Sequence, residues 1–251
     1  MKSRETRAAM WPERSRDEVG AALLAVIVAI SVLLGLGISL VLVTLTETGI
    51  AANYRDGMET LYAADAAIER ALVDLAMAPD WDAVLSGATR SAFVDGSPGG
   101  TRTLGGTTLD LSALTNRIRC GVPTACSVPA MDAVTAQRPW GSNNPRWELF
   151  GYGPLARIQP TAGIDSRAYV IVWVADDPGE NDGDPLRDGQ PPFVVDSRNP
   201  DNPGRHVVML LAHAYGAAGL RRVVEATVGR TEDSILPPLA KVRILAWREI
   251  R

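Results

Sequence analysis

The strongest constraint on the fold of this 251-residue chain is an apolar run near its N-terminus. The run extends from Ala21 to Thr46, contains no charged residue, and is 26 residues long. As an α-helix rising about 1.5 Å per residue it reaches roughly 39 Å, more than the roughly 30 Å of a bilayer's hydrocarbon core. A buried helix of a soluble protein is the alternative, but such helices are usually much shorter. We therefore predict a membrane-spanning helix.

The flanks of this run predict its orientation and its processing. Residues 1–20 contain five Lys and Arg, whereas no basic residue follows the run until Arg55. Because basic flanks stay in the cytoplasm, we expect the N-terminus inside and the chain after the run outside. A secretory signal peptide has a shorter apolar core, followed by its cleavage site. A charged leader, then Gly20, then a long apolar helix is the order of a type III leader, cut between Gly20 and Ala21.

Residues 47–79 continue the helix with an amphipathic pattern. Apolar side chains recur at separations of three, four and seven residues and are flanked by charges, which is typical of a helix with one apolar stripe. Pro79 predicts where the helix ends. Glycines within the helix favour either close packing against other helices or local unwinding during assembly. The stripe consists of Ile50, Tyr54, Leu61, Ile68, Leu72 and Leu75. The glycines are Gly35, Gly37, Gly49 and Gly57.

Residues 80–251 predict a β-rich head. The part up to 146 is rich in Gly, Ser, Thr and Pro, which predicts turns and short strands rather than long helices. Later segments combine β-branched and aromatic residues with partial alternation, which predicts strands. These segments are 147–159, 167–177, 206–219, 220–230 and 238–250. The turn-like Gly216–Gly219 predicts an antiparallel hairpin of 207–215 and 221–230, with one Ala-rich helix as the alternative. The predicted fold class is α+β, a long helix packed on an antiparallel sheet.

The N-terminal helix resembles that of PilX-type minor pilins of type IV pilus systems. The residues that carry the resemblance are DEVGAALLAVIVAISVLLGLG and then TLTETGIAANYRDGMETLYAADAAIERAL, together covering about residues 17–78. The resemblance implies a pilin-like fold, cleavage by a prepilin peptidase after Gly20, methylation of Ala21, and assembly with other pilins or minor pilins through the helix.

One position departs from the pilin pattern. Ala25 stands where pilins usually carry a Glu that meets the N-terminal amine of a neighbouring subunit. An unpaired buried amine is costly. Members without this Glu occur among PilX-like proteins and among GspK-type pseudopilins of type II secretion. The resemblance therefore implies a subunit that primes or caps a filament rather than repeating along it.

Composition and motifs exclude several functions. With 25 Lys and Arg against 29 Asp and Glu, the chain has a net charge of −4, so we expect no nucleic-acid partner. The sequence has no G-x-S-x-G, P-loop, H-E-x-x-H or paired C-x-x-C motif. Its two histidines, His206 and His213, are expected on opposite faces of a strand. We therefore do not expect an enzyme.

Cys120 and Cys126 predict a disulfide that closes a small loop, because the expected orientation places them in an oxidising compartment. Free thiols are the alternative. A zinc site would need more nearby ligands than the sequence offers.

An acidic run at 176–188 carries oxygen ligands of the kind that Ca²⁺ prefers. It does not fit the EF-hand pattern, because Pro178 stands where the first Asp should be when Gly183 is aligned with the required glycine. A solvated acidic loop is the alternative, and we expect no other cofactor. The candidate Ca²⁺ ligands are Asp177, Glu180, Asp182, Asp184 and Asp188.

These features predict four segments: a cytoplasmic leader (1–20), a transmembrane part of the helix (21–46), its amphipathic continuation (47–79) and a head outside the membrane (80–251). The expected function is that of a minor pilin-like structural subunit. The expected location is the bacterial inner membrane, single-pass with the head in the periplasm, and then a cell-surface pilus. A GspK-like pseudopilin is one alternative, and a membrane-anchored periplasmic binding domain or enzyme is the other.

Overall fold

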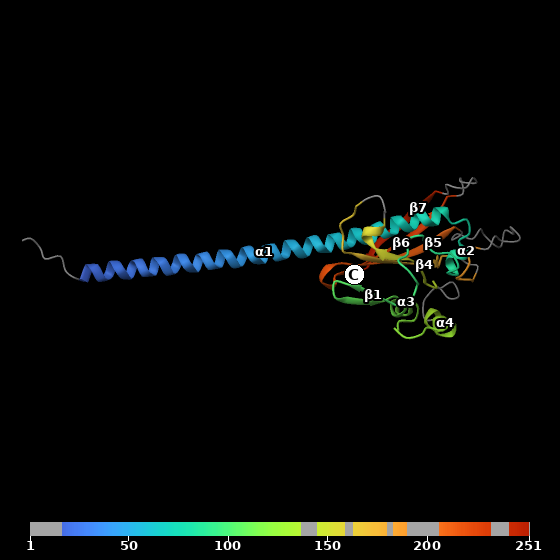
Figure 1. Cartoon of the computed structure of the whole chain (residues 1–251), viewed down its shortest axis with the longest axis horizontal. Helices are drawn as coiled ribbons and strands as arrows, with labels where there is room; N and C mark the ends of the chain where they lie inside the picture. Colours follow the sequence, from blue (N-terminus) through green and yellow to red (C-terminus); the bar gives the residue numbers. More distant parts are fainter. Residues whose placement is uncertain are drawn as a thin grey trace, which may run out of the picture. The chain divides into compact units, whose positions relative to one another are not determined.

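The computed structural model of the chain describes residues 17–136, 145–158, 163–179, 183–189, 206–231 and 241–250 (Figure 1). The chain divides into two compact units, Met1–Asn53 and Tyr54–Arg251. One 61-residue helix, α1 (Asp17–Met77), contributes to both units. The helix ends two residues before Pro79, as predicted, because a proline restricts the residue before it and cannot donate a helical hydrogen bond.

The head contains a five-stranded antiparallel sheet in the order β3-β4-β5-β6-β7. All five predicted strand segments are confirmed, and the predicted hairpin pairs Val207 with Gly229 at one end and Tyr215 with Arg221 at the other. Strand β4, which lies between β3 and the central strand β5, is buried along its whole length, because both faces of the sheet are covered there. The strands are β3 (Glu148–Pro154), β4 (Tyr169–Asp176), β5 (Val207–Tyr215), β6 (Arg221–Arg230) and β7 (Val242–Ile250).

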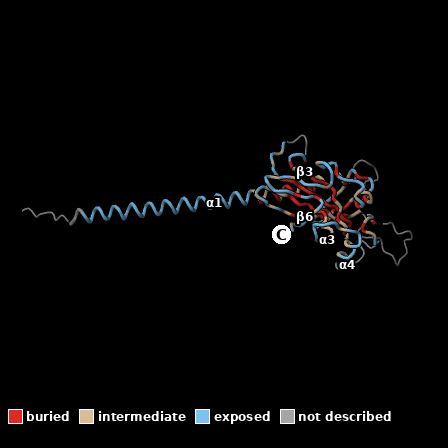
Figure 2. Tube along the Cα trace, turned by 60° about the horizontal axis from the view of Figure 1, so that its bottom comes forward, coloured by how far each residue is buried: buried red, intermediate tan, exposed pale blue. Residues whose placement is uncertain are grey.

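The head part of α1 packs on one face of this sheet through small side chains. Ala63, Ala64, Ala67 and Ala71 are all at most 2% exposed, so the helix backbone lies close to the sheet. Ile68, Leu72 and Leu75 of the predicted stripe are also buried. The valines and alanines of β4, β5 and β6 complete this core, which appears as the buried trace in Figure 2.

The predicted apolar stripe is wrong at its N-terminal end. Ile50 and Tyr54 are 63% and 71% exposed, and the buried face of the helix begins at Gly57 and Thr60. The stripe was traced through large apolar residues, whereas the sheet selects small ones that allow a close approach. Helical periodicity therefore located the amphipathic segment but did not identify its whole contact face.

The other face of the sheet is covered by residues 101–120. A hairpin of β1 (Thr101–Leu104) and β2 (Thr107–Asp110) leads into α3 (Leu111–Cys120). Leu111 is fully buried, and the indole nitrogen of the buried Trp173 donates to Thr115 Oγ1 at 3.0 Å. A second hydrophobic core therefore forms around Trp173, on the face away from α1.

The prediction of only turns and short strands before residue 146 is incomplete. The structure has a short α2 (Asp82–Leu85), the ten-residue α3 and the nine-residue α4 (Val128–Ala136). The signals for α3 are local: the Asp110 carboxylate accepts from the backbone N–H of Ala113, and Gly121 ends the helix at φ 75°. The high content of turn-forming residues around this segment obscured both caps.

The C-terminus of α1 is capped by a side chain from the sheet. No basic residue lies in the last turn of α1, and Arg230 of β6 donates from Nη2 to the carbonyl oxygens of Leu75, at 3.2 Å, and Ala78. Trp81 Nε1 also donates to Leu75 O, at 3.1 Å, and the Arg230 guanidinium stacks 4.5 Å from the Trp81 ring centroid. One side chain thus joins the end of the helix to the sheet.

Gly216, in the turn between β5 and β6, lies against Thr60 of α1. A Cβ at Gly216 would overlap Thr60 Oγ1 and lie 3.3 Å from Thr60 Cβ, and the Thr60 hydroxyl is held by its bond to Asp56 O at 2.7 Å. The φ of Gly216 is −98°, so the obstacle is the side chain of Thr60 and not the backbone conformation.

We expect Gly216→Ala to lower the free energy of unfolding by about 1–2 kcal/mol, because overpacking outweighs the gain from a less flexible unfolded chain. The measurement is chemical denaturation of the full chain in mild detergent, followed by tryptophan fluorescence. The double variant Gly216→Ala with Thr60→Ser still carries the clashing hydroxyl, whereas Gly216→Ala with Thr60→Ala does not. Only Gly216→Ala with Thr60→Ala should recover stability. Equal stability of the single variant and both double variants would contradict a clash with the Thr60 hydroxyl.

Candidate functional site

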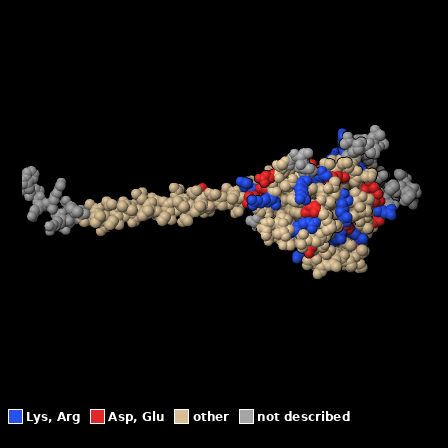
Figure 3. Space-filling view, viewed as in Figure 1, with Lys and Arg blue, Asp and Glu red and all other residues tan. Residues whose placement is uncertain are grey.

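The part of α1 within the first unit presents apolar side chains on all sides. Its large apolar residues, from Leu23 to Leu45, are each between 52% and 68% exposed (Figure 2). From Ala21 to Thr46 it carries no charged residue, which leaves a continuous surface without Lys, Arg, Asp or Glu (Figure 3). Among the described residues, this is the one helix long and apolar enough to cross a membrane. The geometry is compatible with a single-pass membrane protein.

The hydroxyl groups on this helix are bonded within it. Ser31 donates to Ile27 O at 2.8 Å and Ser39 to Gly35 O at 2.9 Å, each one turn back. Thr44, Thr46 and Thr48 make the same bond at 2.8–2.9 Å. Because a donor without a partner is costly in an apolar phase, these internal bonds make the surface suited to lipid or to other apolar helices.

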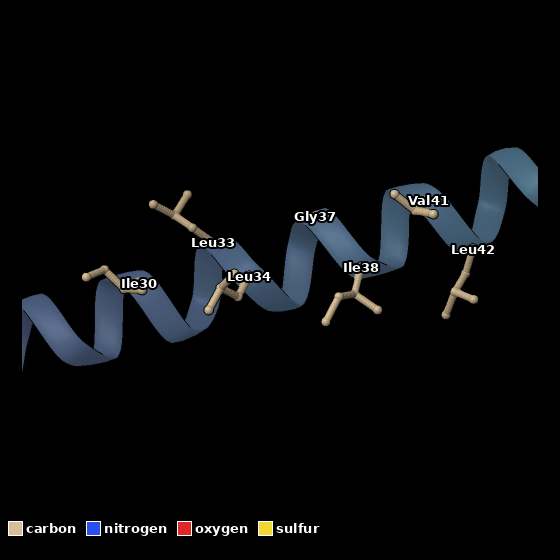
Figure 4. A pocket seen from close by; sticks show the side chains of 7 residues that line it. All are labelled: Ile30, Leu33, Leu34, Gly37, Ile38, Val41 and Leu42. Carbon is tan, nitrogen blue, oxygen red and sulfur yellow. The ribbon is translucent and has the colours of Figure 1, made fainter.

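A shallow groove of about 500 Å³ lies on this helix at Gly37. In Figure 4, Gly37 lies between Leu33 and Val41 in a row with one-turn spacing, and its missing side chain leaves the hollow. Small residues of this kind allow the backbones of two apolar helices to approach closely. The structure is helical through Gly35, Gly37, Gly49 and Gly57. Close packing and local unwinding during assembly both stay predictions for these glycines.

The predicted processing site lies at the start of the same helix. Gly20 is exposed, and a Cβ there would meet nothing within 4 Å. The helix begins at Asp17, so the Gly20–Ala21 bond lies within its first turns. Residues 1–16 of the predicted leader lie outside the described residues. Cleavage and methylation stay predictions, as does the role of Ala25, which is exposed.

The predicted disulfide is present in the head. Cys120, the last residue of α3, is joined to Cys126, with a Cα–Cα distance of 5.9 Å, and no described cysteine is free. The bond closes the turn between α3 and α4. It lies away from the core of the sheet, in a segment whose residues 121–125 are exposed.

We expect the double variant Cys120→Ser, Cys126→Ser to lose about 2 kcal/mol of stability, the chain-entropy value for so short a loop. The full chain in detergent, compared with and without a reductant, gives the measurement. Reductant should destabilise the native chain by the same amount and leave the double variant unchanged. A native chain insensitive to reduction would show that the bond adds nothing to the stability of the head.

The predicted calcium ligands have protein partners where they are described. The Asp188 carboxylate accepts from the backbone N–H of His206 at 2.6 Å and lies 3.1 Å from His206 Nδ1. Asp184 pairs with Arg187 at 3.3 Å, and Asp177 accepts from the N–H of Gly179. Glu180 and Asp182 lie outside the described residues.

Within the described part of the chain, no three His, Cys, Asp or Glu side chains are grouped to hold a metal ion. Burial raises the pKa of Asp188, and His206 opposes this shift. The described contacts make Asp188 part of a structural link to His206, and calcium binding by the acidic run stays a prediction.

The two histidines occupy different environments. His206 lies just before β5 with φ 64° and contacts Asp188, whereas His213 lies within β5 and is 8% exposed. The His213 ring meets Trp173 edge-on at 4.9 Å between centroids, and its Nδ1 lies 3.3 Å from Tyr215 OH. Burial, with a smaller contribution from Arg221, lowers the pKa of His213 to about 4. His213 is therefore a neutral core side chain at pH 7.

The sequence did not predict a partly buried polar link between the segment before β1 and the sheet. The Asp95 carboxylate accepts from Arg102 Nε and from Tyr169 OH, both at 2.9 Å, and Tyr152 OH donates to Gly96 O at 2.7 Å. Burial and the neighbouring Asp95 raise the pKa of Tyr169, so its hydroxyl stays protonated and donates. The partners are up to 74 residues apart, and no local pattern signals them.

The chain has no significant match to any protein-family model, curated protein or solved structure. What it does is inferred from its own residues.

Proposed function

We propose that this chain is a minor pilin-like structural subunit of a type IV pilus. It is held in the bacterial inner membrane by α1 with its head in the periplasm, and after cleavage following Gly20 it enters the cell-surface filament through the same helix. The observation that carries the proposal is the long uncharged helix surface, from Ala21 to Thr46, whose described hydroxyls are bonded internally. Its partners are other pilins or minor pilins, the prepilin peptidase and the membrane lipid.

The physical basis of the proposal is the similarity between the lipid bilayer and the interior of a filament as surroundings for α1. Lipid tails and the helices of neighbouring subunits are both apolar, so transfer between them changes little hydrophobic free energy. Close packing between helices then determines whether α1 stays in the lipid or enters the filament. The groove at Gly37 allows such packing. Ala25 leaves the first mature residue without the carboxylate that a repeating subunit uses, which supports a priming or capping position.

The test is the identity of the mature N-terminus in native cells that express the full chain. Intact-mass measurement should give a methylated Ala21, and Gly20→Leu should leave residues 1–20 attached. Gly49→Ala is the matched control, because it changes a helix glycine that has nothing within 4 Å of a Cβ and lies far from the cleavage site. An unprocessed Met1 in the native protein would contradict the proposal and favour a membrane-anchored periplasmic domain.

Fractionation separates the pilus from the secretion alternative. The subunit should co-purify with sheared surface filaments in an amount that Gly20→Leu abolishes and Gly49→Ala preserves. A processed protein that stays in the envelope, in cells whose type II secretion fails on its deletion, would instead identify a pseudopilin.

A further inference from the structure

The two edges of the five-stranded sheet differ in how they are covered. At β3, the outer side is occupied by the segment around Phe93: Tyr152 N donates to Phe93 O at 2.9 Å and Ser91 N donates to Phe150 O at 3.0 Å. At β7, one side pairs with β6 in eight registered pairs, and no described strand pairs with the other side. Within the described residues, the head therefore covers one sheet edge with its own chain and places no strand against the outer side of the nine-residue β7.

The open edge carries exposed apolar side chains along its length. Ile244, Leu245, Trp247 and Ile250 are between 37% and 47% exposed. Folded proteins usually protect such an edge with prolines, short strands or inward charges, because its free N–H and C=O groups template further strands. β7 carries a bulge opposite Thr227 and Val228 and the exposed Arg243 and Arg248, which disfavour non-specific pairing. Its exposed apolar side chains still offer contacts to a strand of matching charge.

The side chains of β7 give the edge two distinct faces. Trp247 lies on the α1 side, where its Nε1 donates to Asp65 Oδ1 at 2.8 Å. On the opposite side, Ala246 and Ile250 border a groove of about 690 Å³ that extends across β5 and β6 toward α3. The apolar lining of this groove includes Ile118, Trp147, Met209 and Leu211. An added strand would therefore find apolar contacts on both faces.

The charges of β7 indicate what kind of strand fits. Its one acid, Glu249, pairs with Arg222 at 2.8 Å, and Arg248 pairs with Glu225 at 2.6 Å. Arg243 is exposed and follows the exposed Lys241, which makes this end of the edge basic in a chain of net charge −4. A second copy fits poorly, because the antiparallel pairing that sets Ile244 opposite Trp247 also sets Arg243 opposite Arg248, and like charges directly opposite are destabilising.

We propose that β7 is a docking edge for an extended strand of a partner protein. The partner strand has apolar residues opposite Ile244 and Trp247 and a carboxylate opposite Arg243. Because backbone groups on alternate residues point outward, the nine-residue edge offers about four or five residues for main-chain hydrogen bonding. The side chains then set specificity, with Arg243 selecting acidic over basic partners. This inference concerns the head alone and does not rest on the proposed filament function.

The test uses the full chain in detergent micelles and three labelled ten-residue peptides. All three alternate Val and Thr. One has a Glu near its C-terminus, where an antiparallel peptide lies opposite Arg243, one has a Lys at the same position, and one has two prolines that prevent strand pairing. Anisotropy should show the Glu peptide binding about fivefold more tightly than the Lys peptide and no binding of the proline peptide. Arg243→Glu should reverse the preference and Arg243→Gln should remove it. Arg117→Glu, an exposed arginine on α3, should leave it unchanged.

Hydrogen exchange locates the binding site. Amides within 242–250 should exchange several-fold more slowly with the Glu peptide and at their original rate with the proline peptide. Binding of the proline peptide, or tight binding of the Glu peptide without protection of β7, would overturn the proposal. Protection of β7 by raising the concentration of the protein alone would also overturn it, by placing a second copy at the edge.

Discussion

Arg230→Ala is expected to lower the free energy of unfolding of the head by about 3 kcal/mol. The change removes hydrogen bonds from a charged donor to the carbonyls of Leu75 and Ala78. Leu75 O keeps the bond from Trp81 Nε1, whereas the Ala78 carbonyl loses this donor at a partly buried helix end. It also removes a cation stacked 4.5 Å from the Trp81 ring and the positive charge that interacts with the end of the helix dipole. Burial lowers the pKa of Arg230, but not enough to discharge a guanidinium at neutral pH.

The measurement is denaturation of the full chain in detergent, with two matched variants. Arg248→Ala removes an arginine whose side chain is 69% exposed and paired with Glu225, so it should cost at most about 1 kcal/mol. Arg230→Lys keeps the charge but lacks the planar fork, and should fall between the native chain and Arg230→Ala. Equal losses of stability for Arg230→Ala and Arg248→Ala would show that the cap on α1 stabilises the head no more than an exposed ion pair does.

Several parts of the fold could be predicted because their signals are local. The uncharged run from Ala21 to Thr46 predicted a long apolar helix, and Pro79 predicted its end. Gly216 and Gly219 separated two β-branched runs and so predicted the hairpin and its strand limits. In each case a few neighbouring residues determine the conformation without the rest of the chain. These features suffice for the α+β layout and for a possible membrane span.

Other parts depend on contacts between residues far apart in sequence. The cap of α1 comes from Arg230, 152 and 155 residues away from its acceptors, and no pattern near Met77 anticipates it. The face of α1 that meets the sheet combines Ile68, Leu72 and Leu75 with alanines, whose hydrophobicity is too weak to dominate a periodicity argument. The open edge at β7 follows from strand order, which the sequence of one strand does not contain. Sequence therefore located the helix surface of the candidate site but not the docking edge.

The head is also expected to lose stability in acid through His213. Below its unfolded pKa of about 6.5, the unfolded chain binds a proton at this side chain. In the folded head, burial lowers the pKa of His213 to about 4, so the ring stays neutral there. Stability is therefore fully present above pH 6.5 and falls as the pH decreases toward 4. The difference between the unfolded and the folded pKa of His213 corresponds to about 3 kcal/mol of stability.

Two carboxyl groups make the stability of the head depend on pH in the opposite direction, and their contribution must be separated from that of His213. Burial raises the pKa of Glu148 and of Asp188, so each favours the folded head as the pH falls toward its own pKa. The comparison is therefore between variants: His213→Gln, which stays neutral at every pH, should flatten the decline between pH 6.5 and 4. His206→Gln is the second comparison, because His206 lies against Asp188 instead of Trp173. It should change only the part of the profile that Asp188 contributes and leave the decline assigned to His213 in place. Parallel pH profiles for the native chain and His213→Gln would mean that His213 is not the group that couples acid to unfolding, whatever the absolute stability of the variant.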